Sequence, residues 1–534
     1  MKKIFKSIIV VYSLLAVSIV SNSCNDAVDI DQPGIIDDDA IFTSVSNLND
    51  FLIGSVYGNL DTNNEIYVGA VISDEVKPGS GSGGQEFQLH RYFLNNSEGL
   101  VSGIWLNHYR VINRVNRLLE GAGKITPTSS ETAQYNSIIA QARAIRAFSY
   151  VQLESLFSTD MTNPSALGVI LLKDIPDTDA KLPRSTNQEV YDFINADLDY
   201  ARSVLAYSLP TNASARFYVD KGFVNALSAR FNAYRGNYTL AKQYAQDVIS
   251  NSGLTLTAAT PITGGASGAF TNPTPPATLP VNQTSAWNTA FYGIASSFNP
   301  YRNLWNDSSR GEIIFALNRL ATGNGSSIGT RWNTNTSTVS GVPMWFMGRN
   351  LFNLINVQGD VRRYAYIDPT SIIDLNYATS TAPINTDKLI IDKYPGKTSA
   401  ATRNDLKLFR LSEMYFILAE AEVSANNLSV AQSLIQQVRT ARNYLGLATT
   451  PVYTNSQIAY ADILKERRAE LALEGHRYID LKRLAAKAGV TMDRNATDDI
   501  VTVTNLPNGD YRYTLPIPLD ETAANPNCQQ NPGY

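Results

Sequence analysis

Histidine and cysteine are scarce in this chain, with three histidines and two cysteines among 534 residues. His90, His108 and His476 are far apart, and neither a His-Glu-x-x-His motif nor a Cys-x-x-Cys pair occurs. Zinc centres need ligands at such close spacings, so the sequence predicts no metal site and no cofactor. A structural calcium ion is possible, but no motif indicates one.

Charge is also scarce. Charged residues make up 17% of the chain, below the quarter or so that is usual for soluble domains. The net charge is −4, and no block of lysines and arginines stands out. Proteins that bind nucleic acid through charge present such basic clusters. We therefore expect no nucleic acid among the partners.

One apolar run stands out, at residues 8–20, and three lysines precede it. It is too short to span a bilayer comfortably. The run leads to Cys24 in a way that resembles a bacterial lipoprotein signal, although Ser21 stands where such signals usually carry leucine. The resemblance implies that residues 1–23 are removed and that Cys24 is acylated. An ordinary secretory signal is the alternative. Residues 24–40 would then form an acidic tether between the lipid and the folded protein.

Apolar residues recur every three or four positions in eight segments, which predicts helices. These segments are residues 105–119, 132–157, 189–205, 219–234, 240–250, 408–425, 430–442 and 460–473. Ala229 with Ala241, and Ala419 with Ala431, are each twelve positions apart across a turn. Small residues at this spacing let antiparallel helices approach closely, as in tetratricopeptide-type hairpins. The predicted fold is mainly α, a tetratricopeptide-like scaffold of helical hairpins (an alpha-alpha superhelix) with a few short strands.

The middle of the chain has a different chemistry, because no Asp, Glu, Lys or Arg occurs in residues 248–301. The segment is rich in Thr, Asn and Pro, with aromatic residues among them, and we interpret it as part of an irregular, loop-rich lobe. Aromatic rings stack on the apolar face of a sugar, and neutral amides bond to its hydroxyls. The candidate ligand residues in this lobe are Trp287, Tyr292, Tyr301 and Trp332. Burial in the core is the alternative for both tryptophans.

Three glutamates recur at every fourth position in residues 466–474. Like charges at this spacing on a helix repel each other, so we expect cations from elsewhere to neutralise them. The predicted structural ion-pair network comprises Arg410, Glu466, Arg467, Glu470, Glu474 and Arg477. The alternative is the acid/base pair of a glycoside hydrolase.

Three strings near the end of the chain are distinctive. They are LKERRAELALEGHRYIDLKR at 464–483, FRLSEMYFILAEA at 409–421, and LPIP at 515–518 followed by NPNCQQNPGY at 525–534. Together they closely resemble the C-terminal signature of the SusD/RagB family. The resemblance implies an outer-membrane lipoprotein that faces the cell exterior, with a helical scaffold and a variable lobe. It also implies a partner, a TonB-dependent transporter of the SusC type, to which oligosaccharides are delivered.

The family signatures belong to the scaffold, so the ligand residues must be sought in this sequence itself. In the family, the segment after the first helix also contributes to the ligand face. Here that segment supplies the candidates Tyr67, Asp74, Arg91 and Tyr92. Asp74 and Arg91 can equally serve as surface or salt-bridge residues.

The sequence thus predicts a non-catalytic, cell-surface protein that binds an oligosaccharide or polysaccharide. A peptide-capturing member of the same family and a surface glycoside hydrolase are the alternatives. Ser327 lies in a Gly-x-Ser-x-Gly pattern, but the residues behind it are too rich in Asn and Thr for the helix that a nucleophilic serine requires. The expected organisation is a helical scaffold at 41–250, a ligand-binding lobe at 251–405, and signature helices with a tail at 406–534.

Overall fold

The computed structural model describes residues 41–259, 300–332, 342–368, 371–397 and 400–534, except Ser82, Gln85, Asn324 and Ser326. The predicted signal, the acylated Cys24 and the acidic tether lie outside these residues, as do Trp287 and Tyr292.

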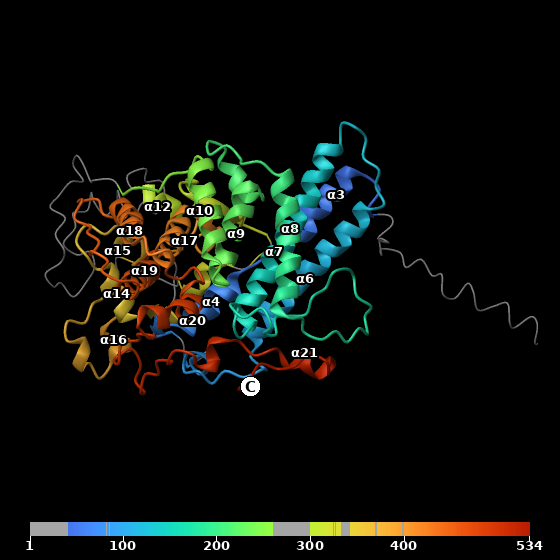
Figure 1. The fold of residues 1–534 in the computed structure, drawn as a ribbon. Helices are drawn as coiled ribbons and strands as arrows, with labels where there is room; N and C mark the ends of the chain where they lie inside the picture. Colours follow the sequence, from blue (N-terminus) through green and yellow to red (C-terminus); the bar gives the residue numbers. More distant parts are fainter. Residues whose placement is uncertain are drawn as a thin grey trace, which may run out of the picture.

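The described chain is mainly helical, as the sequence predicts. The long helices are α6 (Gly99–Ala122), α7 (Thr132–Phe157), α8 (Asn187–Val204), α9 (Lys221–Tyr234), α10 (Tyr238–Asn251), α17 (Leu411–Ser424), α18 (Leu428–Arg442), α19 (Ser456–Glu470) and α20 (Arg477–Ala488). They form a continuous array in which α6, α7 and α8 lie at one end, α9 and α10 in the middle, and α17, α18 and α19 at the other end (Figure 1).

Two helical hairpins carry the predicted close approach. Ala229 and Ala241 of α9 and α10, and Ala419 and Ala431 of α17 and α18, are all fully buried. The first hairpin turns at Gly236, with φ +77°, and the second at Asn426, with φ +61°. Both turns therefore use the left-handed region that glycine and asparagine enter most readily.

Within the described residues, four short strands pair across long stretches of sequence. β1 (Val76–Pro78) pairs antiparallel with β3 (Trp345–Met347), and β2 (Ile313–Leu317) pairs antiparallel with β4 (Leu406–Arg410). All five residues of β2 are buried, in agreement with their uninterrupted apolar sequence. The strands thus anchor the loop-rich part of the chain to the helical array.

Most of the shorter elements lie between residues 45 and 90 or in the sequence around β2 and β3. The short helices are α3 (Val45–Phe51), α4 (Asn63–Val71), α5 (Phe87–His90), α12 (Pro300–Trp305), α13 (Gly329–Trp332), α14 (Arg349–Ile355), α15 (Arg362–Tyr366), α16 (Pro383–Thr386) and α21 (Leu519–Ala524). The single-turn segments that matter below are η1 (Leu52–Val56), η2 (Tyr57–Asn59) and η3 (Ala213–Phe217).

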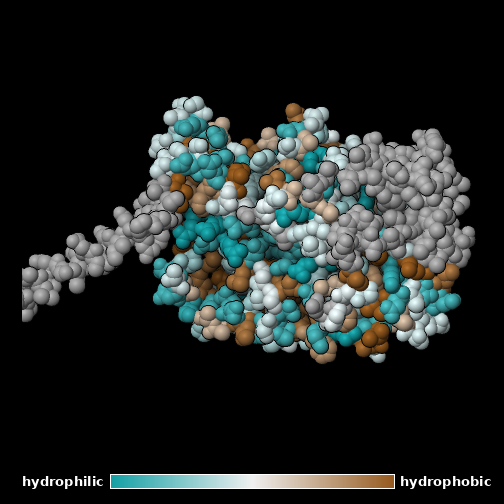
Figure 2. All heavy atoms as spheres, turned by 180° about the vertical axis from the view of Figure 1, so that it is seen from behind, coloured by the Kyte–Doolittle hydropathy of each residue, from teal (hydrophilic) through white to brown (hydrophobic). Residues whose placement is uncertain are grey.

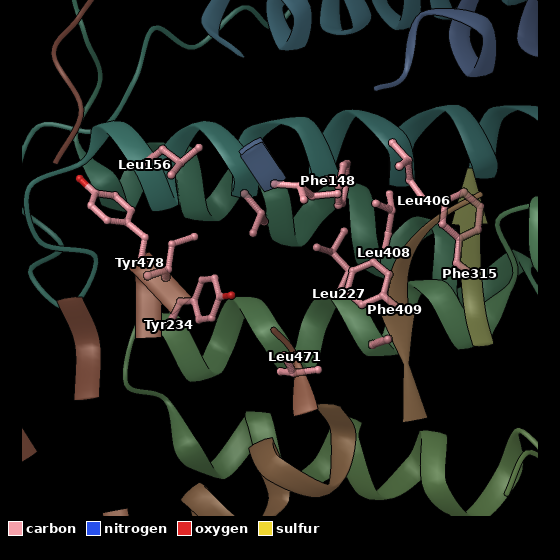
Figure 3. Packing of buried hydrophobic residues seen from close by; sticks show 14 of the residues in the cluster. Phe148, Leu156, Leu227, Tyr234, Phe315, Leu406, Leu408, Phe409, Leu471 and Tyr478 are labelled. Carbon is pink, nitrogen blue, oxygen red and sulfur yellow. The ribbon is translucent and has the colours of Figure 1, made fainter. Parts of the chain in front are cut away.

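Aromatic rings from helices and strands meet in the core. The ring of Phe223 in α9 lies 4.7 Å from that of Phe315 in β2 and 5.3 Å from that of Phe409 in β4, measured between centroids. Figure 3 shows this region, where Phe148 of α7 and Leu227 of α9 approach the residues of β4. Edge-to-face pairs of this kind fix the strands against the hairpins.

The C-terminal tail covers the end of α7. Leu515 N–H donates to Leu156 O at 2.9 Å, and the side-chain amide of Asn531 donates to Phe157 O at 2.9 Å and to Leu515 O at 2.7 Å. Arg184 also donates to the Asn531 side chain, at 2.9 Å. The tail therefore completes the scaffold formed by the N-terminal helices (Figure 1).

Hydrophilic and neutral residues cover much of the described part of the face in Figure 2, with apolar residues scattered among them. Within the described residues, no helix has the length and apolar character needed to cross a membrane.

Several helix boundaries differ from the prediction, and two of the differences have a clear structural cause. The apolar segment predicted as a helix from residue 408 begins in β4, and α17 starts only at Leu411. The segment predicted as a helix to residue 473 ends at Glu470, because Leu473 turns back with φ +61°. Apolar periodicity alone does not distinguish a buried strand from the first turn of a helix.

Candidate functional site

The glutamates of residues 466–474 are neutralised by arginines from other elements. Arg410 donates to Glu470 Oε1 and to Glu474 Oε1, each at 2.7 Å, and Arg442 donates to Glu470 Oε1 at 2.8 Å. Burial alone would raise the pKa of Glu470, but the Arg442 and Arg410 guanidiniums hold that pKa well below its ordinary value. The structure thus brings these residues into one buried cluster that joins α19 to β4 and α18.

Other members of the predicted network pair nearby. Glu466 accepts from Arg362 and from Arg439, each at 2.7 Å. Arg467 donates to Asp480 at 2.7 and 3.0 Å. These carboxylates are buried in the scaffold and accept hydrogen bonds from arginines, so they offer no acid/base pair to a substrate.

Asp74 and Arg477 form a separate buried pair. Arg477 donates to both carboxylate oxygens of Asp74, at 2.7 and 2.8 Å, and Arg468 approaches the same carboxylate at 3.4 Å. The interpretation of Asp74 as a ligand residue is therefore wrong for this structure, because its oxygens already have partners and are not exposed. Asp74 therefore links the segment that follows α4 to helix α20.

Three more predicted ligand residues form side-chain hydrogen bonds within the protein, namely Arg91, Tyr92 and Tyr301. Arg91 donates to both carboxylate oxygens of Asp499, at 2.9 and 2.8 Å. Tyr92 donates to Ile72 O at 2.8 Å, and the Tyr301 hydroxyl lies 2.6 Å from that of Tyr366. Tyr92 and Tyr301 are buried, so neither presents a ring face for sugar stacking, contrary to the prediction.

Tyr67 and Trp332 come together, although they are far apart in the sequence. Their ring centroids lie 5.2 Å apart, and both side chains are fully buried. Trp345 Nε1 donates to the Tyr67 hydroxyl at 2.7 Å, and that hydroxyl donates to Glu86. The burial of both rings contradicts the prediction that they stack on a sugar.

Two charged side chains of this aromatic cluster, Arg331 and Glu86, reach its surface. The Arg331 guanidinium lies 4.4 Å from the centroid of the Tyr67 ring, and Arg331 Nη1 lies 3.5 Å from Glu86 Oε1. Both charged side chains are about a quarter to a third exposed. The cluster therefore offers polar contacts above a filled aromatic core. Trp287 and Tyr292, the other two predicted stacking residues, lie outside the described residues.

A separate groove, which the sequence does not predict, combines open aromatic surface with polar groups. Its volume is about 360 Å³, within the size range of ligand sites, about 300–1,000 Å³. Tyr57, Phe217 and Tyr218 line it together with Asn318 and Arg319. Ile53, Gly54, Gly58, Leu317 and Leu320 complete the lining. The residues come from η1, η2, η3 and the end of β2.

The aromatic side of this groove is held in place from behind. Tyr57 donates to Gln141 Oε1 at 2.8 Å and accepts from the Val219 N–H at 2.8 Å. Burial raises the pKa of Tyr57 well above its ordinary value, so this hydroxyl stays protonated. The Tyr218 ring packs edge-on against Tyr57, with 6.1 Å between centroids, and Tyr218 is 49% exposed.

Arg319 is held in place by Leu60 and Asp61, which follow η2. Its Nη2 lies 3.1 Å from Asp61 Oδ1 and donates to Leu60 O at 3.3 Å. Asn318, beside it, is exposed and lines the groove. The groove therefore presents a ring and an amide, the groups that bind the apolar faces and hydroxyls of sugars, with the buried Arg319 side chain beside them.

One sequence signal could have located this groove. Phe217 and Tyr218 are adjacent aromatic residues in a short polar stretch before a predicted helix, where no core pattern requires them. Within the described residues, no group of three or more His, Cys, Asp or Glu side chains is arranged to hold a metal ion.

Two family models match the chain in separate parts. The SusD family model matches residues 327–534. A SusD-like model described as "Starch-binding associating with outer membrane" matches residues 27–232. SusD-like protein P2 of Formosa agariphila is 25% identical over 482 residues, which cover 85% of each chain. SusD-like protein P25 of the same organism is 24% identical over 550 residues, which cover 97% of each chain.

Solved structures share the fold. A SusD superfamily protein from Bacteroides thetaiotaomicron superposes with a TM-score of 0.71 at 23% identity, over 92% of this chain and 100% of that chain. Surface glycan-binding protein A from Bacteroides uniformis superposes with a TM-score of 0.66 at 18% identity, over 91% and 99%. The two SusD family models together match well over half of the residues, so the chain belongs to the SusD family.

Proposed function

We propose that this protein binds an oligosaccharide or polysaccharide at the outer membrane without cleaving it, and delivers it to a SusC-like TonB-dependent transporter. The observation that carries the proposal is the groove between Tyr218 and Asn318, where a half-exposed ring stands beside an exposed amide. A sugar ring can lie on Tyr218 while its hydroxyls bond to Asn318.

The lining of this groove favours binding over hydrolysis. A glycoside hydrolase needs two carboxyl groups on either side of the scissile bond. The described lining residues include no Asp or Glu, and the nearest acid in the contacts above, Asp61, is paired with Arg319. The buried glutamates of α19 are occupied by arginines and cannot replace that pair.

Similar proteins support the ligand class and the location. Structures with this fold include one described as a SusD-like carbohydrate binding protein from Bacteroides vulgatus and the surface glycan-binding protein from Bacteroides uniformis. The model that matches residues 27–232 is described by its association with the outer membrane. An acylated Cys24 would provide that association, with residues 24–40 as the tether to the groove-bearing scaffold.

Affinity electrophoresis through gels that contain plant, host or microbial polysaccharides tests the proposal. We expect at least one neutral polysaccharide to retard the wild type, and Tyr218→Ala to lose most of this retardation, because the variant lacks the ring on which the apolar face of the sugar lies. Phe93→Ala is the matched control, since Phe93 is 66% exposed but does not line the groove.

The outcomes separate the alternatives. Equal retardation of wild type and Tyr218→Ala would place the ligand elsewhere. Retention of peptides with no retention of any polysaccharide would favour the peptide-capturing function. Release of new reducing ends by the wild type would show hydrolysis. Co-purification of the transporter with the wild type from detergent-solubilised outer membranes tests the partner, and Cys24→Ser should leave the protein unattached to membranes.

A further inference from the structure

A second cavity lies on the scaffold, away from the groove. Its volume is about 610 Å³, and it is lined by the end of α7 and the residues that follow it, by Tyr234 of α9, by α20 and by the C-terminal tail. It shares no lining residue with the groove. Ser155 of α7 lines this cavity, whereas Tyr57 of the groove bonds to Gln141 of the same helix. At about 1.5 Å per residue, these two positions are about 21 Å apart along α7.

Lys482 of α20 gives this cavity an unpaired positive charge. Its ammonium donates to Ser158 O at 2.6 Å and forms no ion pair with any residue that the structure describes. Burial lowers the pKa of Lys482 to about 8, while Asp160 and Glu154 act in the opposite direction without contacting it. An ammonium in this setting keeps donors free for an anion.

Most other charges around the cavity already have partners. Arg483 donates to both carboxylate oxygens of Glu420 and to Asp480, and Asp510 accepts from Arg512. Lys487 is exposed and forms no ion pair within the described chain. Asp160 is exposed, and its Oδ1 accepts from Thr162. Two lysines therefore line the cavity without an ion pair in the described chain, and of its two lining carboxylates, Asp160 and Asp510, only Asp160 has no ion pair there.

Tyrosines supply the remaining walls. Tyr511 is 46% exposed and packs edge-on against Tyr534, with 5.1 Å between ring centroids. Tyr234 and Tyr513 line the cavity more deeply. A flat apolar face that lines the same cavity as an ammonium without an ion pair suits a ligand that has both a ring with an apolar side and a carboxylate.

We propose that this cavity is a second binding site, which takes a carboxylate-bearing sugar such as a uronic acid, with its carboxylate on Lys482 and its ring on Tyr511. The site is independent of the groove, so it does not require that the groove bind a glycan.

The test measures binding of methyl glucuronide and of methyl glucoside to the purified full-length protein by saturation-transfer NMR and calorimetry at pH 7. We expect the glucuronide to bind at least tenfold more tightly than the glucoside. Lys482→Met should abolish this preference, whereas Lys465→Met, an exposed lysine of α19, should preserve it. Equal binding of the two sugars, or an unchanged preference in Lys482→Met, overturns the proposal.

Two further variants keep the test decisive. Tyr511→Ala changes a half-exposed ring and leaves Lys482 in place, so it tests the site even where Lys482→Met does not fold. We expect it to weaken glucuronide binding at least fivefold. Tyr218→Ala should leave glucuronide binding unchanged, and its loss in that variant would assign the sugar acid to the groove. Acetate as the only ligand bound would show that charge alone is recognised, which overturns the assignment to a sugar.

Discussion

Arg477 of α20 and Asp74, which follows α4, form a bidentate ion pair, with 2.7 Å from Nε to Oδ1 and 2.8 Å from Nη2 to Oδ2. Neither side chain is more than 5% exposed. Two parallel hydrogen bonds make such pairs strong and fix their geometry. This pair holds the beginning of the folded chain to the C-terminal signature helices, 403 positions later.

Asp74→Asn should therefore destabilise the fold and leave ligand binding intact. Removing one charge of a buried pair leaves the arginine uncompensated, which costs about 3–5 kcal/mol. Asp493→Asn is the matched control, because Asp493 also pairs with Arg468 but is 60% exposed. We expect a loss below about 1 kcal/mol there. Urea unfolding gives both values. Loss of polysaccharide retention by folded Asp74→Asn would restore Asp74 as a ligand residue.

Arg410→Met should be among the most damaging substitutions in the scaffold. The variant leaves Glu470, Glu474 and Glu312 with one guanidinium fewer, and all three are buried. We expect a loss of about 3–5 kcal/mol in the free energy of unfolding. Arg110→Met, an exposed arginine of α6 with no ion pair in the described chain, should shift the melting temperature only slightly. Similar melting of the two variants would mean that the network contributes little.

The stability of the protein should contain a component that decreases as the pH rises from about 5 to 8. Burial raises the pKa of Glu154 from 4.5 to about 8. Between these values the folded state holds this proton and the unfolded state releases it, so each step up in pH favours unfolding. Glu154→Gln removes the component. The melting temperature of Glu154→Gln relative to that of the wild type should rise as the pH goes from 5 to 8, and the two proteins should differ least near pH 5.

Glu120→Gln, at an exposed position of α6, is the control for this series and should follow the wild type at every pH. A constant difference between Glu154→Gln and wild type from pH 5 to 8 would show that Glu154 is ionised in the folded protein.

The alanine contacts of the hairpins should not tolerate larger residues. Ala241→Leu inserts three carbons where α10 packs on α9 and α17, and overpacking of this kind costs about 1–3 kcal/mol. Ala133→Leu, at an exposed position of α7, should be nearly neutral. Thermal unfolding compares the two. An Ala241→Leu variant as stable as wild type would mean that the helices separate without cost.

Most of the fold could be predicted from the sequence, because amphipathic helices leave a periodic pattern. The helix predicted at 132–157 has the same bounds as α7, and that at 189–205 differs from α8 by one or two residues at each end. The prediction failed where chain segments distant in sequence meet. Residues 408–410 pair with β2, and that pairing makes a strand out of residues that periodicity assigns to a helix.

The site was harder to predict, because burial of an aromatic residue depends on what packs over it. Tyr67 and Trp332 are separated by most of the scaffold in sequence, yet each covers the other. Tyr218 has no such cover and is half-exposed. Composition shows that rings are abundant, but it does not show which rings remain uncovered once the chain has folded.

The hydrogen bonds between the C-terminal tail and the end of α7 can form only after nearly the whole chain has been synthesised. Asn531 follows its partner Phe157 by 374 positions. At about 5–20 residues per second, a ribosome needs roughly 20–75 s to make the intervening chain. Until then the end of α7 has no cover, so chaperones that shield nascent apolar segments should engage the chain there.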